Sequence, residues 1–253
     1  VSTPEGFKWL YREAQKGHFR VIKAKTTSNK FLPLEYIESL KAQYPPNLLK
    51  AYLDGEFINL TSGTVYSYFN RSKHHTDREI EDRDILHIGQ DFNIGGCCGK
   101  IHVIDKDIPK MVGEFSVNDT QSIINYLQKN YSKHTIIIYP DASGSSSKTN
   151  ASESDIDLLK KAGFLIIVPK KNGYVKDRVN SINTLFSQDK YLINTHTCPE
   201  GTNALEQQAY DKNGDPEKFS GGGTIDDYND SSGYFIVRKF PIAKRGYVAV
   251  QTN

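Results

Sequence analysis

An uninterrupted apolar run constrains the fold of this chain more than any other feature. Residues 135–139 read Thr-Ile-Ile-Ile-Tyr, and consecutive β-branched residues favour a strand that is buried on both faces. Residues 120–131 before this run have the apolar spacing of an amphipathic helix, and residues 152–162 after it are expected to form another helix. A buried strand between two helices is typical of a parallel sheet covered by helices, so the sequence predicts a three-layer α/β domain.

The neighbouring segments extend the same sheet. Residues 85–92 form a second buried-type strand, residues 97–105 follow as its hairpin partner, and residues 110–117 add a third strand. A strand at 164–168 and a helix at 176–186 continue the pattern. We therefore expect a mixed sheet flanked by helices, with ligands bound beyond the carboxyl ends of its parallel strands.

The first seventy residues have a different, mostly helical pattern. Pro33 opens a helix that continues toward residue 44, and a second helix is expected at 47–53. The polar stretch 71–84 has no apolar period and is the expected linker, so the predicted domains are residues 1–70 and 71–253. Shorter runs that look extended are residues 19–22, 57–60 and 65–69.

Composition excludes several classes of protein. No apolar run approaches the roughly 18–20 residues needed to cross a bilayer, and no signal peptide opens the sequence, so an intracellular protein is expected. The three cysteines, Cys97, Cys98 and Cys198, have neither a disulfide pattern nor the spacing of zinc ligands. The net charge of +2 is too small to indicate nucleic-acid binding by itself.

Basic charge is instead concentrated in residues 160–178. Such a run is usually a solvated face, but it is also suited to contacts with the phosphate backbone of DNA. The predicted DNA-binding residues within it are Lys170, Lys171, Lys176 and Arg178.

A group of aspartates near the C-terminal end is the strongest functional signal. Asp226, Asp227 and Asp230 share one turn if the segment around them is helical, which crowds like charges together. A divalent cation held by oxygen ligands would offset that charge. Two further aspartates, Asp91 and Asp141, follow predicted strands and could converge on the same point.

Helix capping explains part of this group. Thr224 followed three residues later by Asp227 fits a capping box, and carboxylates in a first helical turn are stabilised by about 0.3–1 kcal/mol each. That stabilisation fades after one turn, so Asp230 is the strongest candidate ligand of the three. Asp227 remains open between ligand and cap, and Asp226 is the weakest candidate.

Converging carboxylates favour metal-dependent hydrolysis of phosphodiesters. Two divalent ions roughly 3.5–4 Å apart can activate water and stabilise the leaving oxygen, and Mg²⁺ or Mn²⁺ accepts carboxylates from rigid strand ends. Ordinary turn or strand-end roles are the alternative for Asp91 and Asp141. Glu114, at the end of the third strand, is an additional candidate ligand, and its alternative is an exposed strand-end glutamate. The predicted catalytic residues are Asp91, Asp141 and Asp230, and the predicted ligands of two Mg²⁺ or Mn²⁺ ions add Asp227, with Asp226 as a further candidate.

Three motifs around these aspartates resemble a known family. Residues 88–93 (Ile-Gly-Gln-Asp-Phe-Asn), 139–145 (Tyr-Pro-Asp-Ala-Ser-Gly-Ser) and 227–234 (Asp-Tyr-Asn-Asp-Ser-Ser-Gly-Tyr) resemble the nuclease motifs of the large terminase subunit of tailed bacteriophages, with the P22-like group most similar. Residues 1–11 and 52–57 resemble the coupling motif of its packaging ATPase and the segment that leads into its nuclease. The resemblance covers essentially the whole chain.

This resemblance implies a fold, an activity and partners. The implied fold is a ribonuclease H-like mixed sheet flanked by helices, preceded in residues 1–70 by a small, mostly helical remnant of a P-loop ATPase domain. The implied activity is cutting of concatemeric double-stranded viral DNA during genome packaging, with two metal ions. The implied partners are double-stranded DNA, the ATPase domain of the full-length protein, the portal protein and the small terminase subunit, in the host cell cytoplasm, without a membrane and outside the mature virion.

The sequence also departs from the family pattern. The family often has histidine three residues before its last aspartate, where this chain has Asp227, and Asp230 is followed by Ser-Ser-Gly-Tyr rather than Ala-Leu-Arg-Tyr. No phosphate-binding loop with Gly-Lys-Ser or Gly-Lys-Thr is present, so ATP hydrolysis is not expected. The main alternative is another ribonuclease H-like nuclease, such as a junction resolvase or an integrase-like enzyme. Such an enzyme would lack the upstream motifs in residues 1–11 and 52–57. A DNA-clamping module without catalysis would have lost one of the three main aspartates.

Overall fold

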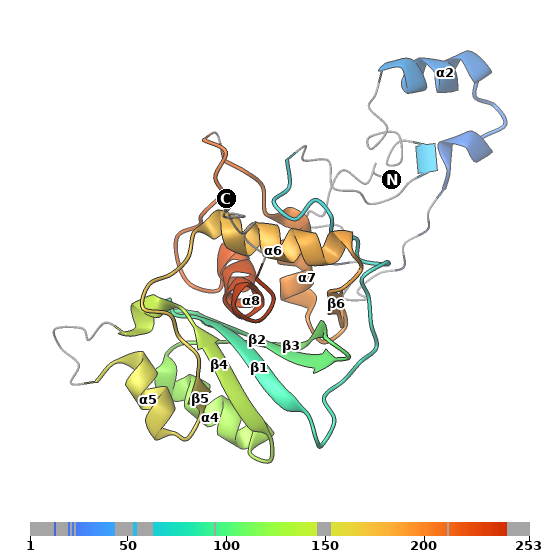
Figure 1. The fold of residues 1–253 in the computed structure, drawn as a ribbon. Coiled ribbons are helices and arrows are strands. Elements are labelled where there is room, and N and C mark those ends of the chain that lie inside the picture. The colour runs from blue at the N-terminus through green and yellow to red at the C-terminus, as the bar shows by residue number, and fades with distance from the viewer. Residues whose placement is uncertain are drawn as a thin grey trace, which may run out of the picture. The chain divides into compact units, whose positions relative to one another are not determined.

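The computed structural model describes most of the second half of the chain and parts of the first. It covers Glu13, Arg20, Ile22 and residues 24–43, 53–54, 63–93, 95–145, 153–211 and 213–241. The chain divides into two compact units, one formed by residues 1–64 and 209–215 and the other by residues 65–208 and 216–253 (Figure 1). Whether residues 1–70 are a remnant of an ATPase domain stays a prediction.

The first unit contains one short core in its described part. A 3-10 helix at Thr26–Ser28 precedes helix α2, Leu34–Gln43, which begins directly after Pro33 as the sequence predicts. Ile37 and Leu53 form a small apolar cluster. The extended runs expected at 19–22 and 57–60 and most of the helix expected at 47–53 lie outside the described residues.

The second unit is built on a six-stranded mixed sheet. Its strand order is β5-β4-β1-β2-β3-β6, with β1 antiparallel to β2, β2 antiparallel to β3, and parallel pairs β1/β4, β4/β5 and β3/β6. This arrangement confirms the predicted mixed sheet. The strands are β1 (Ile85–Asp91), β2 (Cys97–Asp105), β3 (Ile108–Val117), β4 (Thr135–Pro140), β5 (Leu165–Ile166) and β6 (Leu192–Ile193).

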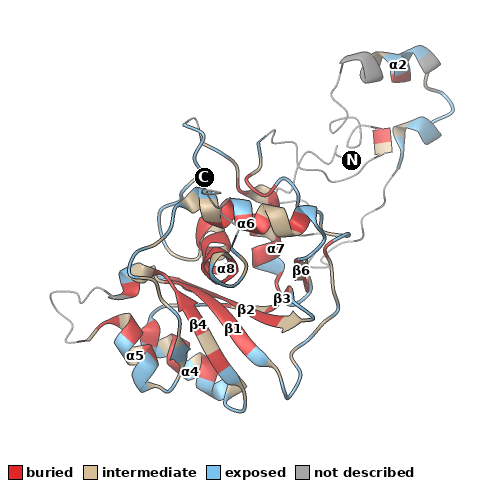
Figure 2. Ribbon diagram, viewed as in Figure 1, coloured by how far each residue is buried: buried red, intermediate tan, exposed pale blue. Residues whose placement is uncertain are grey.

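Helices cover both faces of this sheet. One face is covered by α4 and α5 and the other by α6, α7 and α8, and the residues buried beneath each group form two separate apolar cores (Figures 1 and 2). No helix in the described ranges is both long and apolar enough to span a membrane. The helices are α4 (Thr120–Tyr131), α5 (Asp155–Lys161), α6 (Val175–Ser187), α7 (Pro199–Gln207) and α8 (Ile225–Lys239).

Three local predictions differ from the structure. Residues 65–69 were expected to be extended but form a turn, because Val65 and Tyr66 insert into the core beneath α6 and α8 instead of pairing with a strand. The strand expected at 164–168 is reduced to Leu165–Ile166. Strand β6 and helix α7 were not predicted, although Pro199 at the start of α7 is a helix-start signal.

The polar stretch 71–84 lies within the second unit. It forms neither helix nor strand but is held by ion pairs: Arg71 bonds Glu206 at 2.8 Å, and Arg78 bonds both Asp84 at 2.7 Å and Asp105 at 3.1 Å. These contacts anchor the segment to α7 and to the end of β2.

Helix α8 crosses β1 with its backbone in close contact with the strand at Gly89. A Cβ atom at Gly89 would lie 1.9 Å from the carbonyl oxygen of Ser231, well inside contact distance. Only glycine therefore permits this crossing. Because Asp91 is two residues further along β1, the crossing also fixes which turn of α8 lies beside the end of that strand.

Two histidines are buried beneath this crossing. His87 and His102 lie against the ring of Phe235, with ring centroids 5.4 and 4.5 Å away, and His102 Nε2 is 2.8 Å from the hydroxyl of Tyr191. Burial lowers the pKa of His87 to about 4, with a further contribution from Lys239, and lowers the pKa of His102 to about 3. Both rings are therefore neutral in the folded protein at neutral pH.

We predict that acidification destabilises the protein through these rings. Their folded pKa values lie below the unfolded value of about 6.5, so as pH falls below 6.5 the unfolded chain binds protons that the folded chain does not. Each ring then costs up to about 1.4 kcal/mol of folding free energy per pH unit. Urea unfolding between pH 7 and 5 should show a shallower loss of stability in His102→Gln than in the wild type, and an unchanged slope would contradict the assignment.

Candidate active site

Asp91 and Asp141 lie side by side at one edge of the sheet. β1 and β4 are parallel, with Gln90 opposite Pro140, so both strands deliver their aspartates at the same carboxyl edge. The backbone N–H of Asp141 donates to the carbonyl of Gln90 at 2.9 Å, which fixes the two strand ends together. Both aspartates are buried, as the sequence interpretation of converging strand ends requires.

Asn93 connects the end of β1 to helix α8. Its side-chain amide donates to Asp91 Oδ2 at 2.8 Å and also to Asp227 Oδ1. Asp227 therefore faces the same site as Asp91, although the two lie 136 positions apart in the chain. Asn93 was not among the predicted site residues; its place in the quoted motif Gln-Asp-Phe-Asn is the signal that could have identified it.

The two oxygens of Asp227 have different partners. Oδ2 accepts from the backbone N–H and the hydroxyl of Thr224, both at 2.9 Å, which forms the predicted capping box at the start of α8. Oδ1 accepts from Asn93. The sequence left open whether Asp227 caps the helix or is a metal ligand. In the structure, Oδ2 caps the start of α8 and Oδ1 faces Asn93 beside Asp91.

Asp230 is held by two cations from different segments. Arg178 of α6 donates to Oδ1 at 2.8 Å, and Lys218 donates to Oδ2 at 2.6 Å. Lys218 also lies 3.5 Å from Asp226, whose other oxygen accepts from Thr224 at 2.7 Å. Lys218 was missed by the sequence analysis because it lies in an irregular segment without a motif.

Arg178 is not placed as the sequence predicted. It was expected on the DNA-facing surface, but it is 5% exposed and lies over the ring of Tyr234 at 4.7 Å as well as against Asp230. The position within α6 explains the difference, because Arg178 lies on the face of that helix that packs against α8. Lys170, Lys171 and Lys176, the other predicted DNA-binding residues, are exposed.

Asp141 is fixed by the loops around it. Ser143 donates to it through both its backbone N–H and its hydroxyl, and Asn172 donates through its side-chain amide. Next to Asn172 is a cavity of about 280 Å³ whose wall includes Lys171 and Arg178. The exposed basic segment therefore begins directly beside the acidic site.

The pKa of Asp91 indicates how closely the carboxylates are placed. It is raised to about 8, first by burial and then by the charges of Asp230, Asp227 and Asp141. Burial is also the largest cause of the raised pKa of Asp227. The charges of three other carboxylates, one after β4 and two on α8, thus act on Asp91 at the end of β1.

Glu114 does not belong to this group. Its carboxylate pairs with the fully buried Lys100 and accepts from the backbone N–H groups of Glu200 and Gly201, each at 2.8 Å. These N–H groups belong to the first turn of α7, where a negative charge is stabilised. Glu114 therefore anchors α7 to β3, and its candidacy as an extra metal ligand is not supported.

The donor set fits a hard divalent cation such as Mg²⁺ or Mn²⁺. Carboxylate oxygens are the ligands those ions prefer, and a cation would offset the charges that raise the pKa of Asp91. Within the described ranges, these aspartates do not bring three ligand oxygens within 4.8 Å of one another. Asn93, Lys218 and Arg178 hold the oxygens at present, so bound metal would exchange places with some of these partners.

Comparison with known proteins identifies the fold. Residues 114–239 match the family model described as the Terminase RNaseH-like domain. The structure resembles the P22 large terminase nuclease domain, with 17% identity over 71% of this chain and 94% of that one and a TM-score of 0.56. No curated protein sequence matches the chain. The predicted ribonuclease H-like fold is confirmed.

Two further solved structures are similar. One is a large terminase from a thermophilic bacteriophage, with 17% identity, a TM-score of 0.55, and coverage of 93% of this chain and 60% of that one. The chain thus spans about 60% of the length of that terminase. The other is the large terminase nuclease of thermophilic phage G20c with bound magnesium, with 16% identity, a TM-score of 0.50, and coverage of 70% and 98%.

The contacts of Asp91 and Asp230 predict opposite effects on stability. Asp91→Asn removes a buried charge that lies among like charges, so it should raise the free energy of unfolding in a chelator by about 1 kcal/mol. Asp230→Asn deprives buried Arg178 of its charged partner and should lower that free energy by about 1–3 kcal/mol. Urea unfolding of both variants at pH 8.5 in EDTA would measure this, and a shift of the same sign in both would contradict the assigned contacts.

Proposed function

We infer the function from the family to which this domain belongs: the chain carries a terminase RNase H-like domain, and we propose that it is a metal-dependent endonuclease. In this proposal it cuts concatemeric double-stranded viral DNA during genome packaging. The observation that carries the proposal is the convergence of Asp91, Asp141, Asp227 and Asp230 from β1, β4 and α8 at one edge of the sheet. Phosphodiester hydrolysis by divalent metals uses such a set of carboxylates.

Each side chain has a proposed role. Asp91, Asp141 and Asp230 are the catalytic ligands, Asp227 contributes the oxygen that faces Asn93, and Asp226 is the weakest candidate ligand. Two Mg²⁺ or Mn²⁺ ions, when bound, would supply an activated water and stabilise the leaving oxygen. Asn93 orients Asp91 and Asp227 toward each other, and Arg178 fixes the position of Asp230. Magnesium in the G20c nuclease supports this choice of metal.

The proposed DNA path follows the exposed lysines beside the site. Lys170, Lys171 and Lys176 lie on the segment that leads from Asn172 into α6, so a duplex held there would bring a phosphate toward Asp141. Such contacts neutralise phosphates without reading sequence, which fits a sequence-tolerant nuclease. Arg178 is left out of this path because its charge is used by Asp230.

The remaining features of the proposal rest on the family. As part of a terminase large subunit, the chain would act with an ATPase domain, the portal protein and the small subunit in the host cell cytoplasm, and would be absent from the mature virion. It would not hydrolyse ATP itself, because the sequence has no phosphate-binding loop. The family match favours this function over a junction resolvase, an integrase-like enzyme or a DNA clamp.

We predict that the chain nicks supercoiled plasmid with Mg²⁺ or Mn²⁺ and that EDTA abolishes the activity. Ca²⁺ should bind without supporting cleavage, because it prefers longer bonds and more ligands. Asp91→Asn should lower the rate by at least about 100-fold, since it removes a charged group that would hold the metal. Conversion of supercoiled to open-circular DNA on a gel measures the rate.

Asp107→Asn is a matched control for this substitution. Asp107 lies in the exposed turn between β2 and β3 at φ 66°, a conformation that asparagine also tolerates. This variant should keep the full rate. Undiminished cleavage by Asp91→Asn, or by the wild type in excess EDTA, would refute the proposed mechanism.

A second prediction concerns how the chain holds DNA. Lys171→Gln and Lys176→Gln should each lower the slope of log binding constant against log salt concentration by about one, and weaken binding equally on unrelated duplexes. Anisotropy of a labelled duplex, measured in the Asp91→Asn background to prevent cleavage, gives this slope. Lys133→Gln, an exposed lysine just before β4 at the opposite edge of the sheet, should leave the slope unchanged. If all three variants have the same salt slope as the Asp91→Asn background, Lys171 and Lys176 do not contact the DNA.

A further inference from the structure

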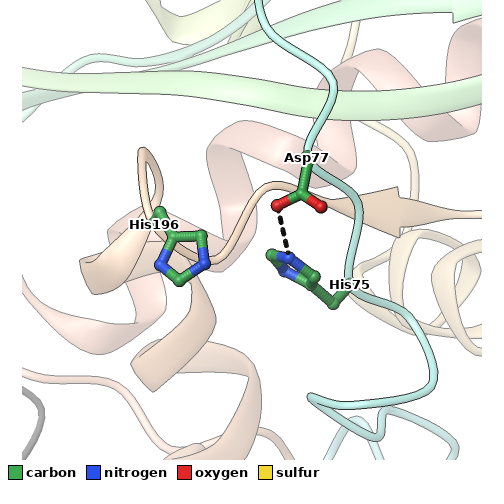
Figure 3. Close-up of side chains that lie close together, drawn as sticks. All are labelled: His75, Asp77 and His196. Atoms are coloured by element: carbon green, nitrogen blue, oxygen red, sulfur yellow. Dashed lines mark hydrogen bonds and ion pairs between the residues drawn. The ribbon is translucent and has the colours of Figure 1, made fainter.

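A second group of metal-ligating side chains lies away from the acidic site. His75, Asp77 and His196 each offer a ligand atom, and these atoms all lie within 4.8 Å of one another. In the part of the chain that the structure describes, this is the only group of three histidine, cysteine or carboxylate side chains with such a spacing. Figure 3 shows the imidazole of His196 facing His75 and Asp77, which come from a different segment.

The backbone that carries these residues is held in place by strand β6. The N–H of Ile193 donates to the carbonyl of His74 at 2.8 Å, and the N–H of Thr76 donates to the carbonyl of Ile193 at 3.0 Å. His75 and Ile193 thus form a parallel bridge. The segment from 75 to 77 is therefore aligned with the residues that follow β6 and lead to His196.

The turn that carries His196 is fixed as well. The side-chain oxygen of Asn194 accepts from the backbone N–H groups of His196 and Thr197, at 3.1 and 3.3 Å. The rings of His75 and His196 lie edge to face with centroids 5.0 Å apart. Two rigid backbone segments thus present three ligand groups to one point, which lowers the ordering cost of binding.

The hydrogen bonds of His75 select the nitrogen that would bind a metal. The hydroxyl of Thr195 lies 2.9 Å from Nδ1, while Nε2 lies 3.0 Å from Asp77 Oδ1. Without metal, Nε2–H donates to the Asp77 carboxylate and Nδ1 accepts from the Thr195 hydroxyl. With a metal bound, Nε2 would give up its proton to present a lone pair to the ion, and Nδ1–H would donate to the Thr195 oxygen. A hydroxyl or carbonyl that holds the remote ring nitrogen is the usual support for a metal-bound histidine.

We propose that His75, Asp77 and His196 form a zinc-binding site that joins the 75–77 segment to the β6–α7 connection. Two imidazoles and one carboxylate are ligands that suit Zn²⁺, with water in the fourth position, whereas Mg²⁺ prefers an all-oxygen shell. A tetrahedral ion with bonds of about 2.0–2.1 Å separates its ligand atoms by roughly 3.3 Å, so small side-chain rotations bring the present group into range. Exposure of Asp77 and His196 lets the ion enter from solvent.

This site is distinct from the acidic one and does not depend on the proposed nuclease function. β6 is the edge strand, and β2 and β3 separate it from β1, which carries Asp91. The two sites also differ in ligand chemistry, nitrogen and oxygen in one and oxygen alone in the other. A competition with Mg²⁺ therefore separates them.

The test is a zinc titration of the untagged 253-residue chain in millimolar Mg²⁺, which competes for the acidic site. Equilibrium dialysis at pH 7.5 should give one bound Zn²⁺, and zinc should raise the melting temperature. His196→Ala and Asp77→Asn should each weaken zinc binding at least about tenfold and remove the thermal shift.

A control variant and a spectroscopic measurement show whether the bound zinc lies at this group. His134→Ala, which changes a partly exposed histidine outside the group, should bind zinc as the wild type does. Co²⁺ in the wild type should give the strong visible absorption of a four-coordinate site, and His196→Ala should lose it. Absence of zinc binding by the folded wild type in Mg²⁺, or equal zinc affinity in His196→Ala and the wild type, would overturn the proposal.

Discussion

The close crossing of helix α8 over strand β1 is the constraint on which the rest of the structure depends. The backbone of Ser231 contacts the sheet at Gly89 so closely that no side chain fits between them. This contact sets the rotation and height of α8. Asp227, one turn earlier, and Asp230, the preceding residue, are thereby placed beside the end of β1. The aromatic ring of Phe235, one turn later, is placed over His87 and His102.

Charge balance is the second organising factor, and it differs between Asp230 on α8 and Asp91 at the end of β1. Asp230 is neutralised by Arg178 and Lys218, whereas buried Asp91 accepts a hydrogen bond from the neutral amide of Asn93 and lies among like charges, so its pKa is raised. The site therefore combines a fixed ion pair with a carboxylate that gains most from an incoming cation. Elsewhere in the unit, the Glu114 carboxylate matches the buried charge of Lys100 and also accepts hydrogen bonds from the start of α7.

Much of the fold and part of the site could be predicted from the sequence. The apolar runs at 135–139 and 85–92 were correctly predicted to be buried strands of one sheet, because both faces of these strands are largely buried. Asp91 and Asp141 could be placed at one edge for the same reason. By contrast, β6 has only two residues, and Val65 and Tyr66 have strand-like composition but are drawn into a turn by tertiary packing.

The partners of the aspartates could not be predicted in this way. Lys218 and Arg178 reach Asp230 from a loop and a helix that are far apart in the chain, and nothing in their local pattern distinguishes them from solvated surface cations. The same holds for His75 and His196, which β6 brings together across 120 residues. Local periodicity fixes which face of an element is buried, but the pairing of polar side chains depends on the assembled sheet.

The divided contacts of Asp227 restrict what can replace it. Its Oδ2 accepts hydrogen bonds from Thr224 and its Oδ1 accepts one from Asn93, so both oxygens must be acceptors. An asparagine would turn an amide donor toward another donor on one side or the other, and a glutamate, one methylene longer, would move both oxygens away from the helix start. Folding of α8 and assembly of the acidic site therefore impose the same requirement at one position, and aspartate is the side chain that meets both demands.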